Sequence, residues 1–197
     1  MLEDDAELDG EDLDGVDLTG AEADGVHLTR CTFRSVLLTG TRLGRVRMRG
    51  VRFESCDLSG ALLDEAVLTD VAFDRCRMTG FVLSGRVADL RVTGCKLDDA
   101  VLRGITGSGV VVEDTTLLEA DLQRVALTGG SRFDRCDLRG ADVARSRVRG
   151  VRLTGCRLDG LRGASGLAGA VVDPTELVPL GMALLAEHGI VVEDVER

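Results

Sequence analysis

Apolar residues recur at every fifth position through most of this chain. Counting from Leu8, every fifth residue is apolar up to Leu83. The pattern then loses one residue near Gly85, gains one at Gly129–Gly130, and continues to Leu158. The residue two places before each of these centres is also restricted, because only Glu11 among them is charged. Each unit of five therefore has two inward positions and three that face solvent.

A period of five fits neither a strand, with period 2, nor a helix, with period 3.6. It predicts a backbone that turns once per unit. A longer recurrence, at 20 residues, predicts that four units close one coil and that every fourth centre stacks on the one before. One such column reads Leu13, Phe33, Phe53, Phe73, Val92, Val112, Phe133, Leu153, and the next inward column reads Val16, Val36, Cys56, Cys76, Cys95, Thr115, Cys136, Cys156. We expect the rings to stack and the cysteines to act as small buried fillers.

The units resemble the pentapeptide repeat family, whose motif is A(D/N)LXX. Local examples are Ala21-Glu22-Ala23, Ala120-Asp121-Leu122 and Cys136-Asp137-Leu138, and the resemblance covers about residues 4–165. It implies an all-β solenoid: a right-handed quadrilateral β-helix of about eight coils. We assign residues 1–165 to this β-helix and 166–197 to a C-terminal capping and dimerisation segment.

The C-terminal segment predicts a short helix near 174–188. Asp173 is suited to the N-cap, with Pro174 in the first turn and Glu176 at N3, and Gly189 suits the C-terminal end. Residues 190–192 read as a short strand. Its Gly-Ala-x-Val-Asp entry, short helix and Glu/Ala-His-Gly exit resemble the C-terminus of the mycobacterial fluoroquinolone-resistance subgroup of the family, and this resemblance implies a homodimer. The candidate dimer contacts are Leu177, Leu180, Leu184 and Ile190.

Charge is unevenly distributed. The net charge is −10, yet residues 1–24 hold 11 acids and no base, whereas residues 25–172 hold more bases than acids. The candidate acidic partner contacts are Glu7, Asp12, Asp14, Asp17 and Glu22. A candidate basic edge follows two adjacent faces and comprises Arg47, Arg52, Arg86, Arg91, Arg132, Arg147 and Arg152. Its arginines either pair with acids of neighbouring coils or form a contact surface.

No catalytic, cofactor or metal site is expected. The six cysteines form no CxxC motif, the two histidines lie apart, and the glycines at 104, 107 and 109 lack the order and lysine of a phosphate loop. Gly107 instead replaces an apolar centre, which predicts a weak coil. The acidic start has no signal-peptide pattern and no apolar run reaches membrane-spanning length. We therefore expect a cytoplasmic protein with free thiols.

Two functions remain open. The resemblance implies a non-enzymatic DNA mimic that binds DNA gyrase or topoisomerase IV and protects against quinolones or gyrase poisons. The alternative is a generic protein-interaction rod with another partner, supported by outward apolar residues Leu37, Leu62, Val67, Val82, Val101 and Val111. Direct nucleic-acid binding is not expected, because the ends are acidic and exposed aromatics are missing.

Overall fold

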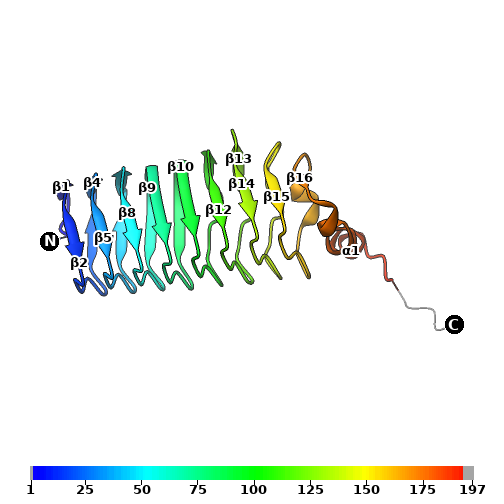
Figure 1. Ribbon diagram of the computed structural model, residues 1–197, viewed down its shortest axis with the longest axis horizontal. Helices are drawn as coiled ribbons and strands as arrows, with labels where there is room; N and C mark the ends of the chain where they lie inside the picture. Colours follow the sequence, from blue (N-terminus) through cyan, green and yellow to red (C-terminus); the bar gives the residue numbers. More distant parts are fainter. Residues whose placement is uncertain (1, 193–197) are drawn as a thin grey trace.

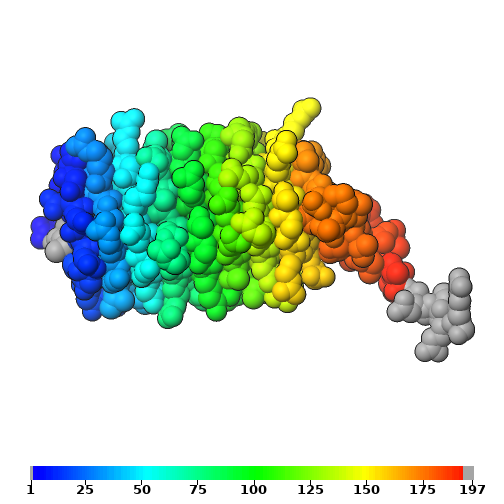
Figure 2. Space-filling view, in the orientation of Figure 1, coloured from blue at the N-terminus to red at the C-terminus, as the bar shows by residue number. Residues whose placement is uncertain are grey.

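Each five-residue unit forms one side of a square coil, and four units complete one turn. In the computed structural model, which describes residues 2–192, the coils stack into a straight rod with a helix at its C-terminal end (Figure 1). The rod keeps a nearly constant width along its length (Figure 2). The coils are numbered from the N-terminus: 6–25, 26–45, 46–65, 66–84, 85–104, 105–124, 125–145 and 146–165.

All strand pairs are parallel, and each joins a coil to the next. Face 1 contains β1 (Glu7–Asp9), β4 (His27–Thr29), β7 (Arg47–Arg49), β11 (Thr106–Ser108) and β13 (Ala126–Thr128). Face 2 contains β2 (Asp12–Asp14), β5 (Thr32–Arg34), β8 (Arg52–Glu54), β12 (Val111–Glu113), β14 (Arg132–Asp134), β15 (Arg152–Thr154) and β16 (Val171–Val172). Face 3 is held by isolated bridges, such as that between Asp17 and Leu37. Face 4 begins with β3 (Glu22–Asp24) and β6 (Arg42–Gly44) and continues as bridges. The long strands β9 (Leu62–Asp74) and β10 (Val82–Thr93) run round two corners, from face 4 through face 1 to face 2.

The corners explain why the chain is rich in glycine. Nearly every unit ends in a residue with positive φ, such as Gly60 at 65° or Arg75 at 51°. This left-handed conformation costs L-residues about 1–2 kcal/mol but is open to glycine. The four sides of a coil can therefore meet at sharp corners, and many of these are closed as β-turns, as where Ala61 N–H donates to the carbonyl of Leu58 at 3.0 Å.

The two shifts in the sequence pattern lie where they were predicted. Leu83 pairs with Leu63, but Gly85 pairs with Ala66, so coil 4 is one residue short. Val111 pairs with Arg132, which makes coil 7 one residue long. Both columns of inward residues stay in register through these shifts.

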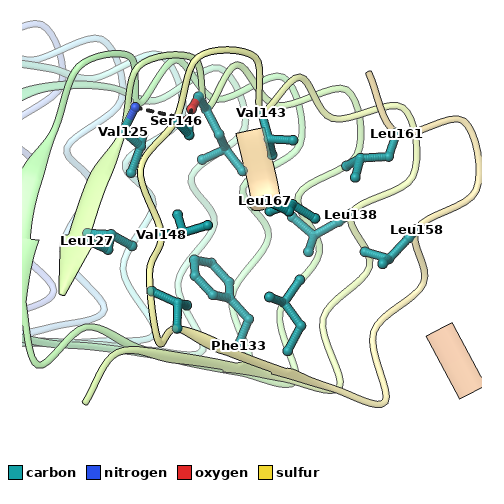
Figure 3. A pocket seen from close by; sticks show the side chains of 13 residues that line it. Val125, Leu127, Phe133, Leu138, Val143, Ser146, Val148, Leu158, Leu161 and Leu167 are labelled. Atoms are coloured by element: carbon teal, nitrogen blue, oxygen red, sulfur yellow. Dashed lines mark hydrogen bonds between the residues drawn. The ribbon is translucent and has the colours of Figure 1, made fainter. Parts of the chain in front are cut away.

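The lumen is filled by stacked side chains. The ring centroids of Phe33 and Phe53, and of Phe53 and Phe73, lie 4.8 Å apart with interplanar angles of 15° and 10°. Beyond Phe73 the column continues with Val92 and Val112, which are smaller. An apolar cavity of about 60 Å³ lies there, and a second of about 40 Å³ lies near the C-terminal end, where Phe133, Val148 and Leu158 point inward (Figure 3).

Cysteine, serine and threonine side chains at inward positions also accept hydrogen bonds from the backbone of the preceding coil. The donor is the backbone N–H of the inward residue one coil earlier, which points along the rod axis toward the accepting side chain. Examples are Cys76 N–H to Cys95 Sγ at 3.3 Å and Val125 N–H to Ser146 Oγ at 3.1 Å, the latter drawn in Figure 3. Cysteine and serine at these positions are therefore acceptors as well as fillers.

The C-terminal segment continues from coil 8 into η1 (Ala164–Leu167), then β16, η2 (Pro174–Glu176) and α1 (Leu177–Glu187). The helix predicted near 174–188 is thus present. The strand predicted at 190–192 is wrong, because these residues follow the helix without regular structure and find no strand to pair with. No helix within residues 2–192 is long and apolar enough to cross a membrane.

Candidate interaction surfaces

Acidic side chains surround the open N-terminal end of the rod. In coil 1 every outward strand position except Thr19 is Asp or Glu. The five candidate contacts are all exposed, but the structure spreads them over four faces: Glu7 on face 1, Asp12 and Asp14 on face 2, Asp17 on face 3 and Glu22 on face 4. They therefore form a rim around the end of the rod.

Coil 2 neutralises part of this rim. It carries arginines and no acid, and its side chains reach back to coil 1: Arg34 Nη1 lies 2.6 Å from Asp12 Oδ1 and Arg42 Nη1 lies 2.7 Å from Glu22 Oε1. A hydrogen bond from Arg45 holds the pKa of Asp24 below its usual range. Asp14 has no ion pair among residues 2–192, so it contributes its full charge to the rim.

The candidate basic edge divides into paired and unpaired arginines. On face 2, Arg52 pairs with Asp70, and Arg132 pairs with Glu113 and Asp134. The other five candidates make no ion pair within the described part of the chain: Arg47, Arg86, Arg91, Arg147 and Arg152. The structure thus shows the paired arrangement for Arg52 and Arg132, and for the other five arginines the contact surface stays a prediction.

The apolar stripe on face 4 is present. Leu62 pairs with Val82, and Val82 bridges to Val101, so the three side chains follow one another up the rod. Val101 is 36% exposed, and Leu62 and Val82 are half-buried. The expectation that Val111 is exposed is wrong: it is only 7% exposed, although its strand position points outward.

The cysteine column is buried. Cys56, Cys76, Cys95, Cys136 and Cys156 all lie inside the rod as free thiols. Hydrogen bonding to Cys56, together with burial, raises the pKa of the Cys76 thiol far above its usual range, and Cys156 does the same for Cys136. Among residues 2–192, no group of three potential ligands could hold a metal ion.

We predict that the native thiols are unreactive, because the thiolate is the nucleophile and burial disfavours it. Native protein should react negligibly with a thiol reagent such as DTNB over hours, whereas urea-unfolded protein should show all six cysteines. A single fast-reacting thiol in the native state would contradict the buried column.

Glu176 anchors the C-terminal helix to the rod. Its carboxylate is fully buried, accepts a hydrogen bond from Cys156 N–H at 2.7 Å and one from Asp173 N–H at 2.9 Å. Asp173 in turn accepts from Thr175 N–H, which completes the predicted capping box. Since Glu176 follows Cys156 by 20 residues, its carboxylate takes the acceptor place that the next cysteine would hold.

Replacing Glu176 with alanine should cost about 2 kcal/mol, because two buried N–H groups lose their acceptor. Urea denaturation would measure the loss, and Glu176→Gln, which keeps one carbonyl acceptor, should cost clearly less. Equal losses in the two variants would show that the hydrogen bonds are not what anchors the segment.

The outer side of α1 is apolar and exposed. Of the candidate dimer contacts, Leu177 is 61% exposed, Leu184 and Ile190 are also exposed, and Leu180 packs partly against the core. Val178 and Met182, which the sequence analysis did not select, add to this surface. Beyond the end of α1 at Glu187, Gly189 N–H donates to the carbonyl of Ala186, and Ile190 N–H donates to the carbonyl of Leu185.

The C-terminal helix should loosen in acid. Hydrogen bonds from Thr175 lower the pKa of Asp173, and those from Ser165 lower the pKa of Glu187. Both folded-state pKa values lie below the unfolded ones, so this stabilisation is complete above about pH 5 and is lost as pH falls through the folded values. Hydrogen exchange of the α1 amides at decreasing pH would test this, with Ser165→Ala expected to flatten the dependence. Protection that stays constant to the lowest pH would contradict it.

A solenoid built from five-residue units, with four units to each coil, defines a repeat protein whose chemistry lies on its outer faces. The pentapeptide repeat family model matches residues 12–50, 47–85 and 131–162, more than half of the chain. The chain belongs to the pentapeptide repeat family.

Solved structures with a similar fold share little sequence with this chain. HetL, a pentapeptide repeat protein involved in heterocyst differentiation regulation in the cyanobacterium Nostoc sp. strain PCC 7120, is 18% identical, with a TM-score of 0.48 over 85% of this chain and 87% of HetL. A trypsin-treated form of QnrB1, a plasmid-mediated fluoroquinolone resistance protein, is 19% identical, with a TM-score of 0.40 over 95% of this chain and all of that one. A search of curated proteins found no significant match.

Proposed function

We propose that this protein is a non-enzymatic DNA mimic that acts in the cytoplasm. In this proposal its acidic N-terminal rim binds the basic DNA-binding surface of a type II topoisomerase, DNA gyrase or topoisomerase IV, and the complex is protected from quinolones or other gyrase poisons. The observation that carries the proposal is the rim itself, because acidic side chains surround the rod's open end on all four faces. Such a surface complements a basic saddle and steers association with it.

The location of the negative charge restricts the mode of contact. Beyond coil 1 the body of the rod carries more bases than acids. In this proposal only the acidic tip of the rod, and not its whole length, mimics DNA. The exposed apolar side of α1 supports a homodimer joined at the C-terminal ends. In such a dimer the two acidic rims would lie at the far ends.

Charge reversal at the rim tests the proposal. Asp14→Lys with Asp17→Lys should weaken binding to purified gyrase, and the wild-type affinity should fall as salt rises. The matched control, Asp64→Lys with Asp159→Lys, makes the same change in net charge on exposed residues away from the rim. Unchanged affinity in the rim variant, or an equal loss in the control, would exclude the rim as the contact.

The second candidate is an interaction rod with another protein partner. It is favoured by the stripe formed by Leu62, Val82 and Val101, since adjacent outward apolar side chains mark protein contacts. This candidate would be supported over the first if the protein bound neither topoisomerase, and if the Val101→Glu variant no longer bound a cellular partner that the wild type binds.

A further inference from the structure

The outward side chains of face 1 contain no acid after coil 1. From coil 2 to coil 8 the outward strand positions are occupied by His27, Thr29, Arg47, Arg49, Val67, Thr69, Arg86, Ala88, Thr106, Ser108, Ala126, Thr128, Arg147 and Arg149. Arginine and hydroxyl groups dominate this set. Such a face is unexpected on a protein with a net charge of −10.

The arginines of face 1 are also unpaired. Arg47, Arg49, Arg86, Arg147 and Arg149 are exposed, and none makes an ion pair with a carboxylate of residues 2–192. Most arginines on the other faces are paired, although Arg91 and Arg152 on face 2 have no ion pair within residues 2–192. Those that reach an acid of another coil include Arg34, Arg42, Arg103, Arg135 and Arg157.

The corner before face 1 carries both signs of charge, because Glu65 ends the preceding unit in coil 3 and Arg45 does so in coil 2. Arg124 and Arg145 end the preceding units in coils 6 and 7, and they too are exposed and without an ion pair in the described chain. Because adjacent cations repel one another, a surface of this kind is more stable when an anion covers it. The positive charge of the rod's body is thus concentrated along one flat face.

The chemistry of face 1 favours phosphate over protein. Guanidinium and hydroxyl groups are the usual donors to phosphate oxygens. A protein interface has an apolar centre, whereas face 1 offers only the half-buried Val67 and two alanines. Face 1 has no Phe, Tyr or Trp to stack on bases and offers only the ring of His27, which argues against a single strand. A flat sheet does not enter a groove to read sequence.

We propose that face 1 docks on the phosphate backbone of duplex DNA without sequence preference. The arginine pairs of coils 3 and 8 lie five coils apart, or about 24 Å at the spacing of adjacent strands. That is the length of about seven base pairs. The sequence argued against nucleic-acid contact because the ends are acidic and exposed aromatics are missing, and it does not show which arginines are already paired.

Fluorescence anisotropy with a labelled 20-base-pair duplex of mixed sequence tests the proposal. Five phosphate contacts predict a log–log salt slope of about −4.5, so binding should weaken about 500-fold between 50 and 200 mM salt. Changing the five face 1 arginines, Arg47, Arg49, Arg86, Arg147 and Arg149, to glutamine should abolish binding. The matched control changes the five paired arginines, Arg34, Arg42, Arg103, Arg135 and Arg157, to glutamine, which alters net charge equally and should preserve the slope.

Two double variants test the proposal if the fivefold variant does not fold. Arg47→Gln with Arg49→Gln, and Arg147→Gln with Arg149→Gln, should each reduce the slope by about 1.8. No duplex binding at 50 mM salt with about 100 µM protein would overturn the proposal. So would equal losses in the face 1 and control variants, or binding of polyglutamate without binding of duplex, which would assign the face to an acidic protein.

Discussion

Replacing Phe53 with alanine is expected to lower the free energy of unfolding by about 3–5 kcal/mol. Phe53 lies between Phe33 and Phe73, with ring centroids 4.8 Å away on both sides. Its side chain is almost fully buried, so truncation removes apolar contacts on two coils and leaves a cavity in the lumen. The neighbouring coils are hydrogen-bonded on every face, which limits how far they can collapse into the space.

Urea denaturation of wild type and variant would measure the effect. Phe53→Leu fills much of the same volume and should cost less than half as much as the alanine variant. A loss below about 1 kcal/mol for Phe53→Ala would contradict a tightly stacked column.

Replacing Gly85 with alanine should destabilise the rod by about 3 kcal/mol or more. Gly85 lies where coil 4 is one residue short, and its φ of 124° is one that L-residues rarely adopt. A Cβ atom there would lie 2.1 Å from the carbonyl oxygen and 2.7 Å from the nitrogen of Ala66. Both are backbone atoms held in the sheet, so neither side chain rotation nor a small local shift relieves the clash.

Gly60 provides the matched control. It too has a positive φ, 65°, but a Cβ atom at this corner would meet nothing within 4 Å. Gly60→Ala should therefore cost only the backbone strain, about 1 kcal/mol. Equal stability of the two variants in urea would show that the close contact at Gly85 is relieved by movement of the coils.

The sequence was sufficient to predict the solenoid because a five-residue period leaves few alternatives. The column from Leu13 to Leu153 could be followed through both register shifts, since inward side chains must stack on one another. The capping box at Asp173 and Glu176 was likewise visible, because its donors and acceptors are close in sequence. What the sequence did not show is that Glu176 also anchors the helix to Cys156, a contact between residues distant in the chain.

The surfaces were less predictable. The repeat pattern shows that a side chain points outward, but it does not show which other side chain it contacts. Arg47 and Arg52 occupy equivalent outward positions on adjacent faces, yet only Arg52 finds a carboxylate. Val111 occupies an outward position but is buried. The β-propensity of Ile190, Val191 and Val192 was misleading, because a strand needs a neighbour and these residues find none within the described part of the chain.

Gyrase supercoiling, with purified protein titrated in the presence and absence of a fluoroquinolone, tests the proposed function most directly. Inhibition of supercoiling, or protection of gyrase from the drug, is expected at low micromolar protein, and both effects should weaken in the Asp14→Lys, Asp17→Lys variant. Supercoiling and drug sensitivity that remain unchanged at saturating protein, with gyrase and with topoisomerase IV, would contradict the DNA-mimic function.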